Sequence, residues 1–244
     1  MPGALEALLA LVREEGKEKA AAHAAAALGI LACNNDIKAT INQLEGAWAA
    51  LVTLLRDGSE AGATQAAWTL WVLAGATESK RAIAEEEGAL VALVKLLRGG
   101  SATGKEVAAG ALWSLALATE NEAAIGQVPD ALAALIELLV NGTGAGKQWA
   151  AAALGVLALN DENKAFIVQQ QGVTEALLAM LVSMQGEGRA NTTRRARSRR
   201  LGRRCNKRPH VLQETVFCRF PHLLSMEVRR ARAPVLEEPR KKVH

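Results

Sequence analysis

The chain has 244 residues and half of them are apolar, so it can bury a sizeable core, although only 3% are aromatic. Its three cysteines give no disulfide framework, which fits a reducing compartment inside the cell, and no apolar run reaches the roughly 20 residues of a membrane-spanning helix. The net charge of +4 hides a split: residues 1–186 carry twelve Lys and Arg against twenty Asp and Glu (net −8), and residues 187–244 carry seventeen against five (net +12). The two parts are therefore interpreted separately, and the second is called the basic tail.

The first predicted element is an amphipathic helix in the N-terminal stretch MPGALEALLALVREEG. This stretch has no positive charge ahead of its apolar residues, so it lacks the pattern of a signal peptide. We expect the protein to act in the cytoplasm, the nucleus or both, without inserting directly into a membrane.

The acidic part of the chain is an internal repeat. Residues 46–87, 88–129 and 130–171 align over 42 positions each without a gap. An earlier copy covers about residues 3–45 with one extra loop residue, and a partial copy covers residues 172–185. One such unit cannot bury its own apolar faces, whereas stacked copies can, so the repeat predicts a solenoid.

Each repeat predicts three helices, because its apolar residues recur three and four positions apart. These are a short first helix such as NKAFIVQQQ, a second such as VTEALLAMLV and a longer third such as KQWAAAALGVLAL. The predicted fold class is an all-α solenoid of about four three-helix repeats. The recurring positions expected in the core are Leu28, Leu70, Leu112 and Leu154; Leu31, Leu73, Leu115 and Leu157; Ala32, Ala74, Ala116 and Ala158; Ile41, Ile83, Ile125 and Ile167; and Leu51, Leu93, Leu135 and Leu177.

A Gly-rich stretch, RGGSATGKEV at residues 98–107, resembles the start of a phosphate-binding loop. Its counterparts in the neighbouring repeats are RDGSEAGATQ and VNGTGAGKQW, which places all three in the turn between the second and third helices. Position 106 is Glu rather than the Ser or Thr that would bind magnesium, and no strand is predicted ahead of the turn. We therefore interpret the glycines as turn residues and predict no nucleotide, metal or other cofactor.

The repeat resembles the armadillo repeat family. The resemblance rests on GALVALVKLLRGGS, on AAWTLWVLA, and on the Asn- and Glu-rich turn followed by Ile in NDENKAFI. It covers about residues 3–185, and the related HEAT-type solenoid is the alternative. The resemblance implies a right-handed superhelix whose third helices line a concave groove, and non-catalytic binding of extended peptides or other proteins in that groove.

One pattern of importin-α-like members of this family is missing. In those members a Trp and, four residues later, an Asn recur on successive third helices, and the Asn holds the backbone of a bound basic peptide. Here the Asn positions hold Ile30, Val72, Ser114 and Val156, and the Trp positions hold Ala26, Trp68, Gly110 and Ala152. We therefore expect a shallow, rather apolar groove, and the net charge of −8 favours a mildly basic or apolar partner segment.

The candidate binding residues lie on the predicted third helices. Trp71 and Trp113 are equivalent and Trp68 lies one turn before Trp71, so these rings are expected at the edge of the core, where they either anchor a partner or pack between repeats. Trp48 and Trp149 are interpreted as structural. The residues predicted for the groove are Trp68, Trp71, Val72, Gly110, Trp113, Ser114, Leu117, Val156 and Leu159. No catalytic set of Ser, His and Asp or of Cys and His is present in this part, so no enzyme activity is predicted.

The basic tail begins where the repeat pattern stops, after Met184. It replaces the third helix of the fifth repeat with 14 Arg, 3 Lys and scattered prolines, a composition that predicts disorder. Its interpretation stays open between a nuclear-localisation or nucleic-acid-binding segment, an out-of-frame or intron-derived sequence, an inert tail, and a zinc site of Cys205, His210, Cys218 and His222. The arginines that would bind nucleic acid are Arg194, Arg195, Arg197, Arg199, Arg200, Arg203 and Arg204.

The ends of the solenoid are expected to be uncapped, because the chain begins and stops within a repeat, like an internal piece of a longer array. Leu177, Leu178 and Leu181 should be partly exposed, and isolated residues 1–186 should self-associate. The predicted function is a protein–protein interaction scaffold. The alternative is a nucleic-acid-associated or nuclear-targeted protein that uses the basic tail.

Overall fold

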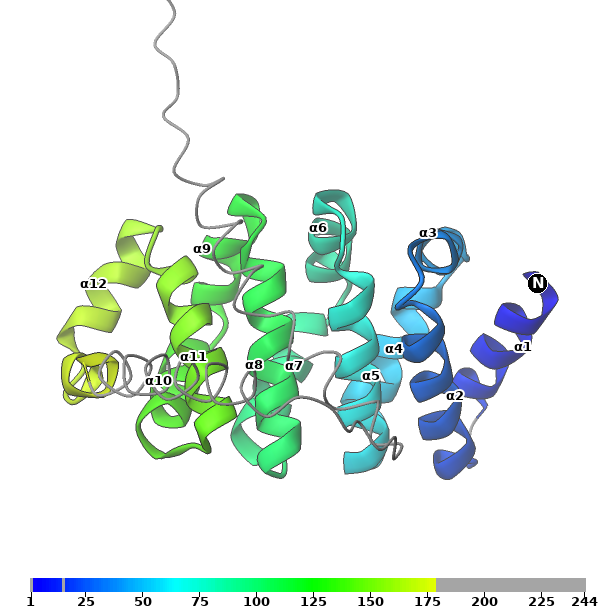
Figure 1. The fold of residues 1–244 in the computed structure, drawn as a ribbon, viewed down its shortest axis with the longest axis horizontal. Coiled ribbons are helices and arrows are strands. Elements are labelled where there is room, and N and C mark those ends of the chain that lie inside the picture. Colours follow the sequence, from blue (N-terminus) through cyan, green and yellow to red (C-terminus); the bar gives the residue numbers. More distant parts are fainter. Residues whose placement is uncertain (1, 15, 179–244) are drawn as a thin grey trace, which may run out of the picture. The chain divides into compact units, whose positions relative to one another are not determined.

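The computed structural model of the protein describes residues 2–14 and 16–178, and every regular element in that part of the chain is a helix (Figure 1). The first helices of the repeats are α3 (Asn35–Gln43), α6 (Thr77–Glu85), α9 (Thr119–Gln127) and α12 (Asp161–Gln169). The second helices are α1 (Pro2–Arg13), α4 (Ala47–Asp57), α7 (Ala89–Gly99) and α10 (Ala131–Asn141). The third helices are α2 (Glu18–Leu31), α5 (Glu60–Leu73), α8 (Ala102–Ala116) and α11 (Gly144–Leu157). The predicted all-α repeat fold is confirmed, and the predictions on the basic tail lie outside the described residues.

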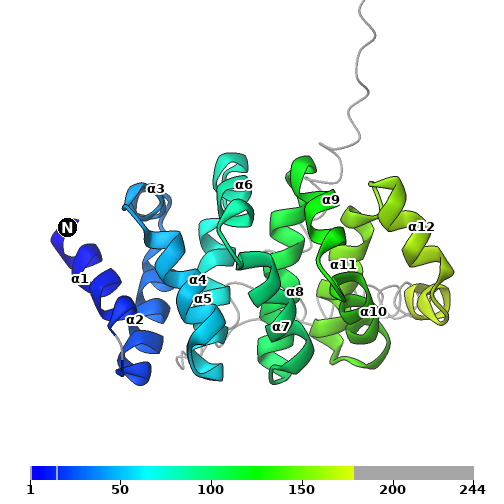
Figure 2. The same cartoon turned by 180° about the vertical axis from the view of Figure 1, so that it is seen from behind.

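The third helices lie side by side on one side of the described solenoid, facing the viewer in Figure 1. The second helices form a row on the opposite side, which Figure 2 shows from behind. The first helices lie at the same end of both rows. Each third helix packs against the second helix of its own repeat and against the third helices beside it, so the repeats are joined mainly through the third helices.

The core lies between these rows, and it consists of the residues that recur from repeat to repeat. Leu70, Leu112 and Ile125 are each at most 1% exposed. Burying one such side chain stabilises the fold by roughly 1.5–3 kcal/mol. The predicted core residues that are only half-buried are Leu31, Ala158 and Leu177. They belong to the repeats at the two ends of the described part of the chain.

Two of the three leucines expected to be partly exposed near the end of the repeats lie among the described residues. Leu177 is half-buried and Leu178 is 56% exposed. Leu181 lies outside the described residues.

The Gly-rich stretch is a helix–helix turn. Gly100 follows α7, and a Cβ atom there would lie 2.6 Å from the carbonyl oxygen of Leu96, so any side chain would clash with the helix end. Ser101 is the N-cap of α8, and its hydroxyl accepts a hydrogen bond from the backbone N–H of Gly104 at 3.2 Å. The same arrangement recurs with Ser59 and Thr143. The resemblance to a phosphate-binding loop is therefore explained by helix termination and capping.

Buried asparagine side chains connect successive first helices to the ends of the third helices. Asn163 donates from its amide to the carbonyl oxygens of Leu157 at 3.1 Å and of Glu122, in the preceding repeat, at 2.8 Å. Asn121, the equivalent residue one repeat earlier, bonds in the same way to Leu115 and Lys80. Leu157 and Leu115 each also accept a backbone N–H at the helix end, from Asn160 and Ala118, so the amides add a second hydrogen bond at these carbonyl oxygens and tie each first helix to the preceding repeat.

In one repeat the equivalent carbonyl oxygen accepts a hydrogen bond from an asparagine at a different position. Ser79 stands at the position of Asn121 and Asn163, and there Asn42 of the preceding first helix donates to both the Leu73 carbonyl oxygen (3.2 Å) and the Ser79 hydroxyl (2.9 Å). Where the later residue is Asn, the position of Asn42 holds a small residue. At Gly126 a Cβ atom would lie 1.8 Å from the Oδ1 of Asn163. The position of Asn42 on one first helix and the position of Ser79 on the next therefore share one space, and an amide at either position donates to the same third-helix carbonyl oxygen.

We expect the double variant Asn42→Ala/Ser79→Asn to lose less stability than the sum of the two single losses, although the hydrogen bond from the Trp48 indole to Asn42 is lost in it. Asn42→Ala leaves the Leu73 carbonyl oxygen without its amide, at a cost of about 1–2 kcal/mol, and Ser79→Asn crowds a second amide against Asn42. Together the changes reproduce the pair Ala84 and Asn121 of the next repeat. Urea unfolding of the four proteins measures the coupling. Losses that simply add would show that the two positions are independent.

Candidate functional site

The exposed side of α2, α5, α8 and α11, here called the third-helix face, is the candidate binding surface. Apolar side chains recur along it and form what is called here the apolar band. Ile30 is 48% exposed and Leu159 64% exposed, and the other members are half-buried. The members of the band are Ile30, Val72, Leu117, Val156 and Leu159. Three of the four Asn positions thus offer methyl groups to a bound segment, and no amide.

The half-buried ring of Trp68 packs from α5 onto α2. A Cβ atom at Gly29 would lie 2.4 Å from a carbon of this ring, so the absence of a side chain on α2 makes room for it. Thr69, the next residue, donates from its hydroxyl to the carbonyl oxygen of Ala25 on α2 at 2.8 Å. Trp68 is therefore fixed between two repeats while part of its ring remains accessible.

Trp71 packs in the opposite direction, over α8, and joins a cluster that spans three repeats. A Cβ atom at Gly110 would lie 2.6 Å from the Trp71 ring. The ring centroids of Trp71 and Trp149 are 4.5 Å apart at an interplanar angle of 86°, and those of Trp113 and Trp149 are 5.5 Å apart. Edge-to-face contacts of this kind contribute about 0.5–1.5 kcal/mol beyond burial of the ring area. The cluster therefore fixes α5, α8 and α11 relative to one another.

The predicted groove residues divide into two layers. Trp68, Trp71 and the apolar band keep accessible surface, whereas Trp113 is 7% exposed and Ser114 5% exposed. The Ser114 hydroxyl donates to the carbonyl oxygen of Ala74 at 3.3 Å, which uses it within the fold. Gly110 lies beneath the Trp71 ring. These three residues support the face from below.

The structural role predicted for Trp149 does not by itself place this residue with the other tryptophans. The structure shows that it contacts both Trp71 and Trp113. The sequence does place Trp149 close to this surface, because it lies three residues before Ala152, and Ala152 is at the position where importin-α-like members carry a Trp. What the sequence could not show is that glycine at position 110 lets a ring of α5 reach α11.

Polar contacts join the third helices at the opposite edge of the face, at their N-terminal ends. The backbone N–H of Ser101 donates to the Glu60 carboxylate at 2.6 Å, across the boundary between two repeats. Hydrogen bonds from the side chain and backbone of Ser101 lower the pKa of Glu60 below its usual value. The Thr143 hydroxyl bonds to the Glu106 carboxylate in a similar position one repeat later.

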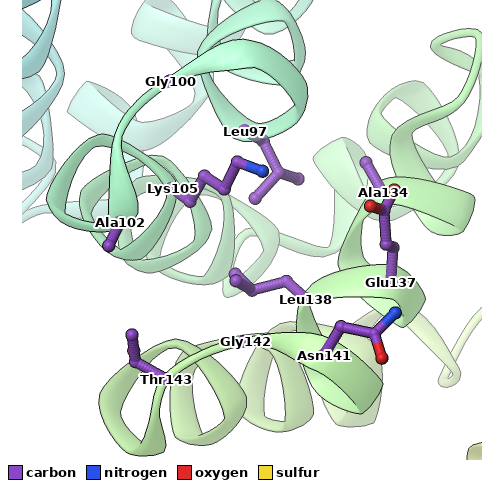
Figure 3. Close-up of a pocket in the computed structure, with 10 residues that line it drawn as sticks. All are labelled: Leu97, Gly100, Ala102, Lys105, Ala134, Glu137, Leu138, Asn141, Gly142 and Thr143. Carbon is purple, nitrogen blue, oxygen red and sulfur yellow. The ribbon is translucent and has the colours of Figure 1, made fainter.

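The described residues also form depressions at the edges between repeats. One, of about 250 Å³, lies between the turn that joins α7 to α8 and the turn that joins α10 to α11 (Figure 3). The side chains of Lys105, Glu137 and Asn141 are among those that border it. Two others lie beside the turn between α1 and α2 and beside the corner between α9 and α10. All three involve turns or corners rather than the apolar band.

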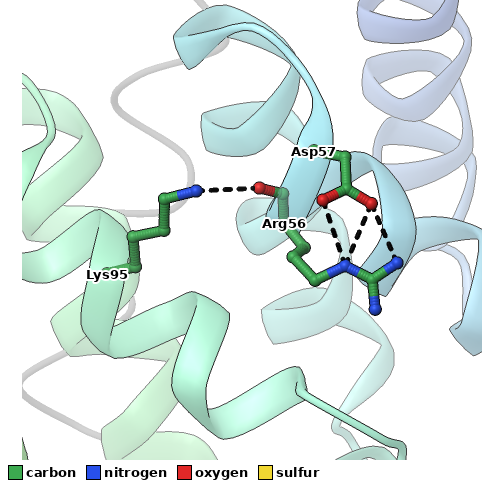
Figure 4. Close-up of polar contacts among 3 residues, drawn as sticks. All are labelled: Arg56, Asp57 and Lys95. Atoms are coloured by element: carbon green, nitrogen blue, oxygen red, sulfur yellow. Dashed lines mark hydrogen bonds and ion pairs between the residues drawn. The ribbon is translucent and has the colours of Figure 1, made fainter.

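Exposed charges link neighbouring second helices on the far side of the molecule (Figure 4). The Lys95 ammonium donates to the carbonyl oxygen of Arg56 at 3.1 Å, and the Arg56 guanidinium pairs with Asp57 at 2.8 Å. The hydrogen bond from Arg56 lowers the pKa of Asp57. Both side chains of this pair are about half exposed, so the pair adds little to stability.

No group of three or more His, Cys, Asp or Glu in the described part of the chain is arranged to hold a metal ion. The zinc candidates of the basic tail and its arginines lie outside the described residues. Over residues 2–14 and 16–178 no single helix is long and apolar enough to cross a membrane. Only α9 and α10 taken together have the length and composition of a membrane span, and these two helices are bent by 89° relative to each other.

Comparison with known proteins agrees with this geometry. Residues 77–117, which comprise α6, α7 and α8, match the model of the Armadillo/beta-catenin-like repeat. The comparison with curated proteins gave no significant match.

Three solved structures with a similar fold are engineered or designed proteins. An engineered protein, structural genomics target OR329, is 28% identical with a TM-score of 0.67, covering 75% of this chain and 74% of its own. The designed armadillo repeat protein YIII(Dq)4CqI is 28% identical with a TM-score of 0.65, covering 72% and 74%. A third, YIII(Dq.V1)4CPAF, was solved in complex with the peptide (KR)4 and is 25% identical with a TM-score of 0.63, over 72% and 74%.

Two alanine variants should have opposite effects on stability. Gly110→Ala pushes the Trp71 ring out of its contact with α8, which should destabilise the protein by about 1–3 kcal/mol. Gly155→Ala, on α11, meets nothing within 4 Å and should stabilise its helix by about 0.5–1 kcal/mol. Urea unfolding followed by tryptophan fluorescence checks both. Equal increases in stability would contradict the packing of Trp71 over Gly110.

Proposed function

We propose that the chain, whose repeats and fold are similar to those of armadillo-repeat proteins, is a non-catalytic scaffold that holds an extended segment of a protein partner on its third-helix face. The observation that carries the proposal is the apolar band, since it runs over a row of helices that pack on one another. Armadillo-repeat scaffolds are in general non-catalytic, which supports a role in binding.

The similarity to a designed armadillo protein solved with the peptide (KR)4 supports a peptide or protein segment as the ligand. The rigid setting of the face supports it further. Trp68 and Trp71 are held by contacts with neighbouring helices, so their accessible edges need no ordering when a partner binds. Surfaces that are ordered in advance lose less conformational entropy on association and bind more tightly for the same contacts.

The contact chemistry proposed here is apolar. With Ile30, Val72 and Val156 at the Asn positions, the partner's backbone is not held by side-chain amides on the third helices. Affinity then depends on apolar area removed from water, at roughly 25 cal/mol for each Å² buried. A partner should therefore present apolar side chains to the band.

A pair of identical substitutions on opposite sides of the solenoid tests the site. Val72→Glu places a charge in the apolar band, and Val91→Glu places the same charge on α7, where Val91 is 59% exposed among the second helices. An extended peptide is first selected from a random library on the full chain, and its affinity for the three proteins is measured by fluorescence polarisation. We expect Val72→Glu to weaken binding at least tenfold, because a charge would be buried without a partner, and Val91→Glu to leave it unchanged.

Two results would contradict the proposal. Equal effects of the two variants would place binding elsewhere on the chain. Failure of every extended peptide to bind the unaltered chain would contradict a segment-binding role altogether. Circular dichroism of both variants separates loss of binding from loss of fold.

A further inference from the structure

We propose that the segment bound by the third-helix face alternates apolar side chains with arginine or lysine, and that carboxylates at the start of the first helices pair with the basic ones. This inference rests on the proposed function and adds the chemistry of the partner. It is carried by two sets of accessible residues: the apolar band, which has at least one member in each of the four repeats, and a row of exposed carboxylates with one member in each.

The first set is the apolar band, which widens toward α11. At Gly155, the position equivalent to Trp71 and Trp113, no atom of the described residues lies within 4 Å of where a Cβ atom would be. Leu159 nearby is 64% exposed. A large apolar side chain of a partner can therefore lie against α11 at a place that tryptophan occupies in the two preceding repeats.

The second set is a row of carboxylates, called here the acidic rim. Each member is the second residue of a first helix, and each is exposed. In the part of the chain that the structure describes, none of the four belongs to an ion pair. The members are Asp36, Glu78, Glu120 and Glu162.

The acidic rim borders the C-terminal end of the third-helix face. Each first helix follows a third helix after a short turn, and the first helices lie together at one end of the row of third helices (Figure 1). Glu120 is three residues from Leu117 and Glu162 three residues from Leu159, so each of these rim carboxylates accompanies a member of the apolar band. Acidic residues also stabilise a helix N-terminus, but that role leaves their charge available to a partner.

The spacing of the repeats favours alternation. Packed helices lie about 8–10 Å apart, and an extended chain rises about 3.3 Å per residue, so a segment crossing the third helices places two to three residues on each repeat. Successive side chains of an extended segment point to opposite sides. One set then contacts the apolar band, and the other, if long and cationic, reaches the acidic rim. The net charge of −8 over residues 1–186 also favours a positively charged partner.

Four peptides of equal length test the proposal on the full chain: alternating leucine and arginine, the same residues in two blocks, alternating lysine and arginine, and alternating leucine and serine. We expect the alternating leucine–arginine peptide to bind at least tenfold more tightly than each of the other three. The block peptide has the same composition, so it controls for unspecific charge and hydrophobicity.

The rim itself is tested by a matched pair of double variants. Glu78→Gln/Glu120→Gln should weaken the alternating leucine–arginine peptide by about three- to tenfold at low salt, as expected for the loss of two exposed ion pairs. Glu45→Gln/Glu137→Gln removes the same charge at exposed positions away from the third-helix face and should have less than a twofold effect. The difference should shrink as salt is raised.

The outcomes separate this inference from the proposed function. Equal affinity for the alternating and block peptides, or equal effects of the two double variants, would overturn the proposal of an alternating partner. The scaffold function would still be supported if Val72→Glu weakens the binding of a selected peptide. Tighter binding of the lysine–arginine peptide would overturn it in favour of a purely basic ligand. No binding by any peptide would count against both.

Discussion

The structure depends on the packing of each third helix against the third helices of the neighbouring repeats. A single three-helix unit exposes apolar side chains on two sides, and residues such as Leu112 and Leu115 reach 0–1% exposure only because α5 and α11 lie beside α8. The third-helix face is the remaining side of these same helices. Its shape is therefore a consequence of core packing, and a partner that binds there meets a surface set by the fold.

Small residues and asparagines determine how closely the repeats approach. Gly29 and Gly110 let tryptophan rings cross between third helices. Asn121 and Asn163 donate hydrogen bonds to carbonyl oxygens at the C-terminal ends of the third helices. The rings leave apolar edges accessible, while the amides hold the first helices and their carboxylates in register. The apolar band and the acidic rim are thus products of two different inter-repeat contacts, one apolar and one hydrogen-bonded.

The repeat allowed much of the fold to be predicted. Leucines such as Leu70 and Leu112 recur at helical spacing, so helix number, helix order and core could be derived from the sequence. The layering of the site could not, because equivalent residues such as Trp71 and Trp113 differ in exposure according to what the next repeat offers. The exchange between Asn42 and Ser79 also escaped, since it depends on side chains in two repeats meeting at one carbonyl oxygen. Contacts between repeats, rather than helix periodicity, decide these features.

The most direct test of the central claim, that a partner segment lies on the third-helix face, uses the indole N–H signals of the five tryptophans in an NMR titration. Trp68 and Trp71 lie on the face, whereas the indole of Trp48, between a first and a second helix, donates to Asn42 at 3.2 Å. The account predicts that saturation with a bound peptide shifts the signals of Trp68 and Trp71 and leaves that of Trp48 in place. Saturable binding that shifts Trp48 alone, or neither Trp68 nor Trp71, would contradict it.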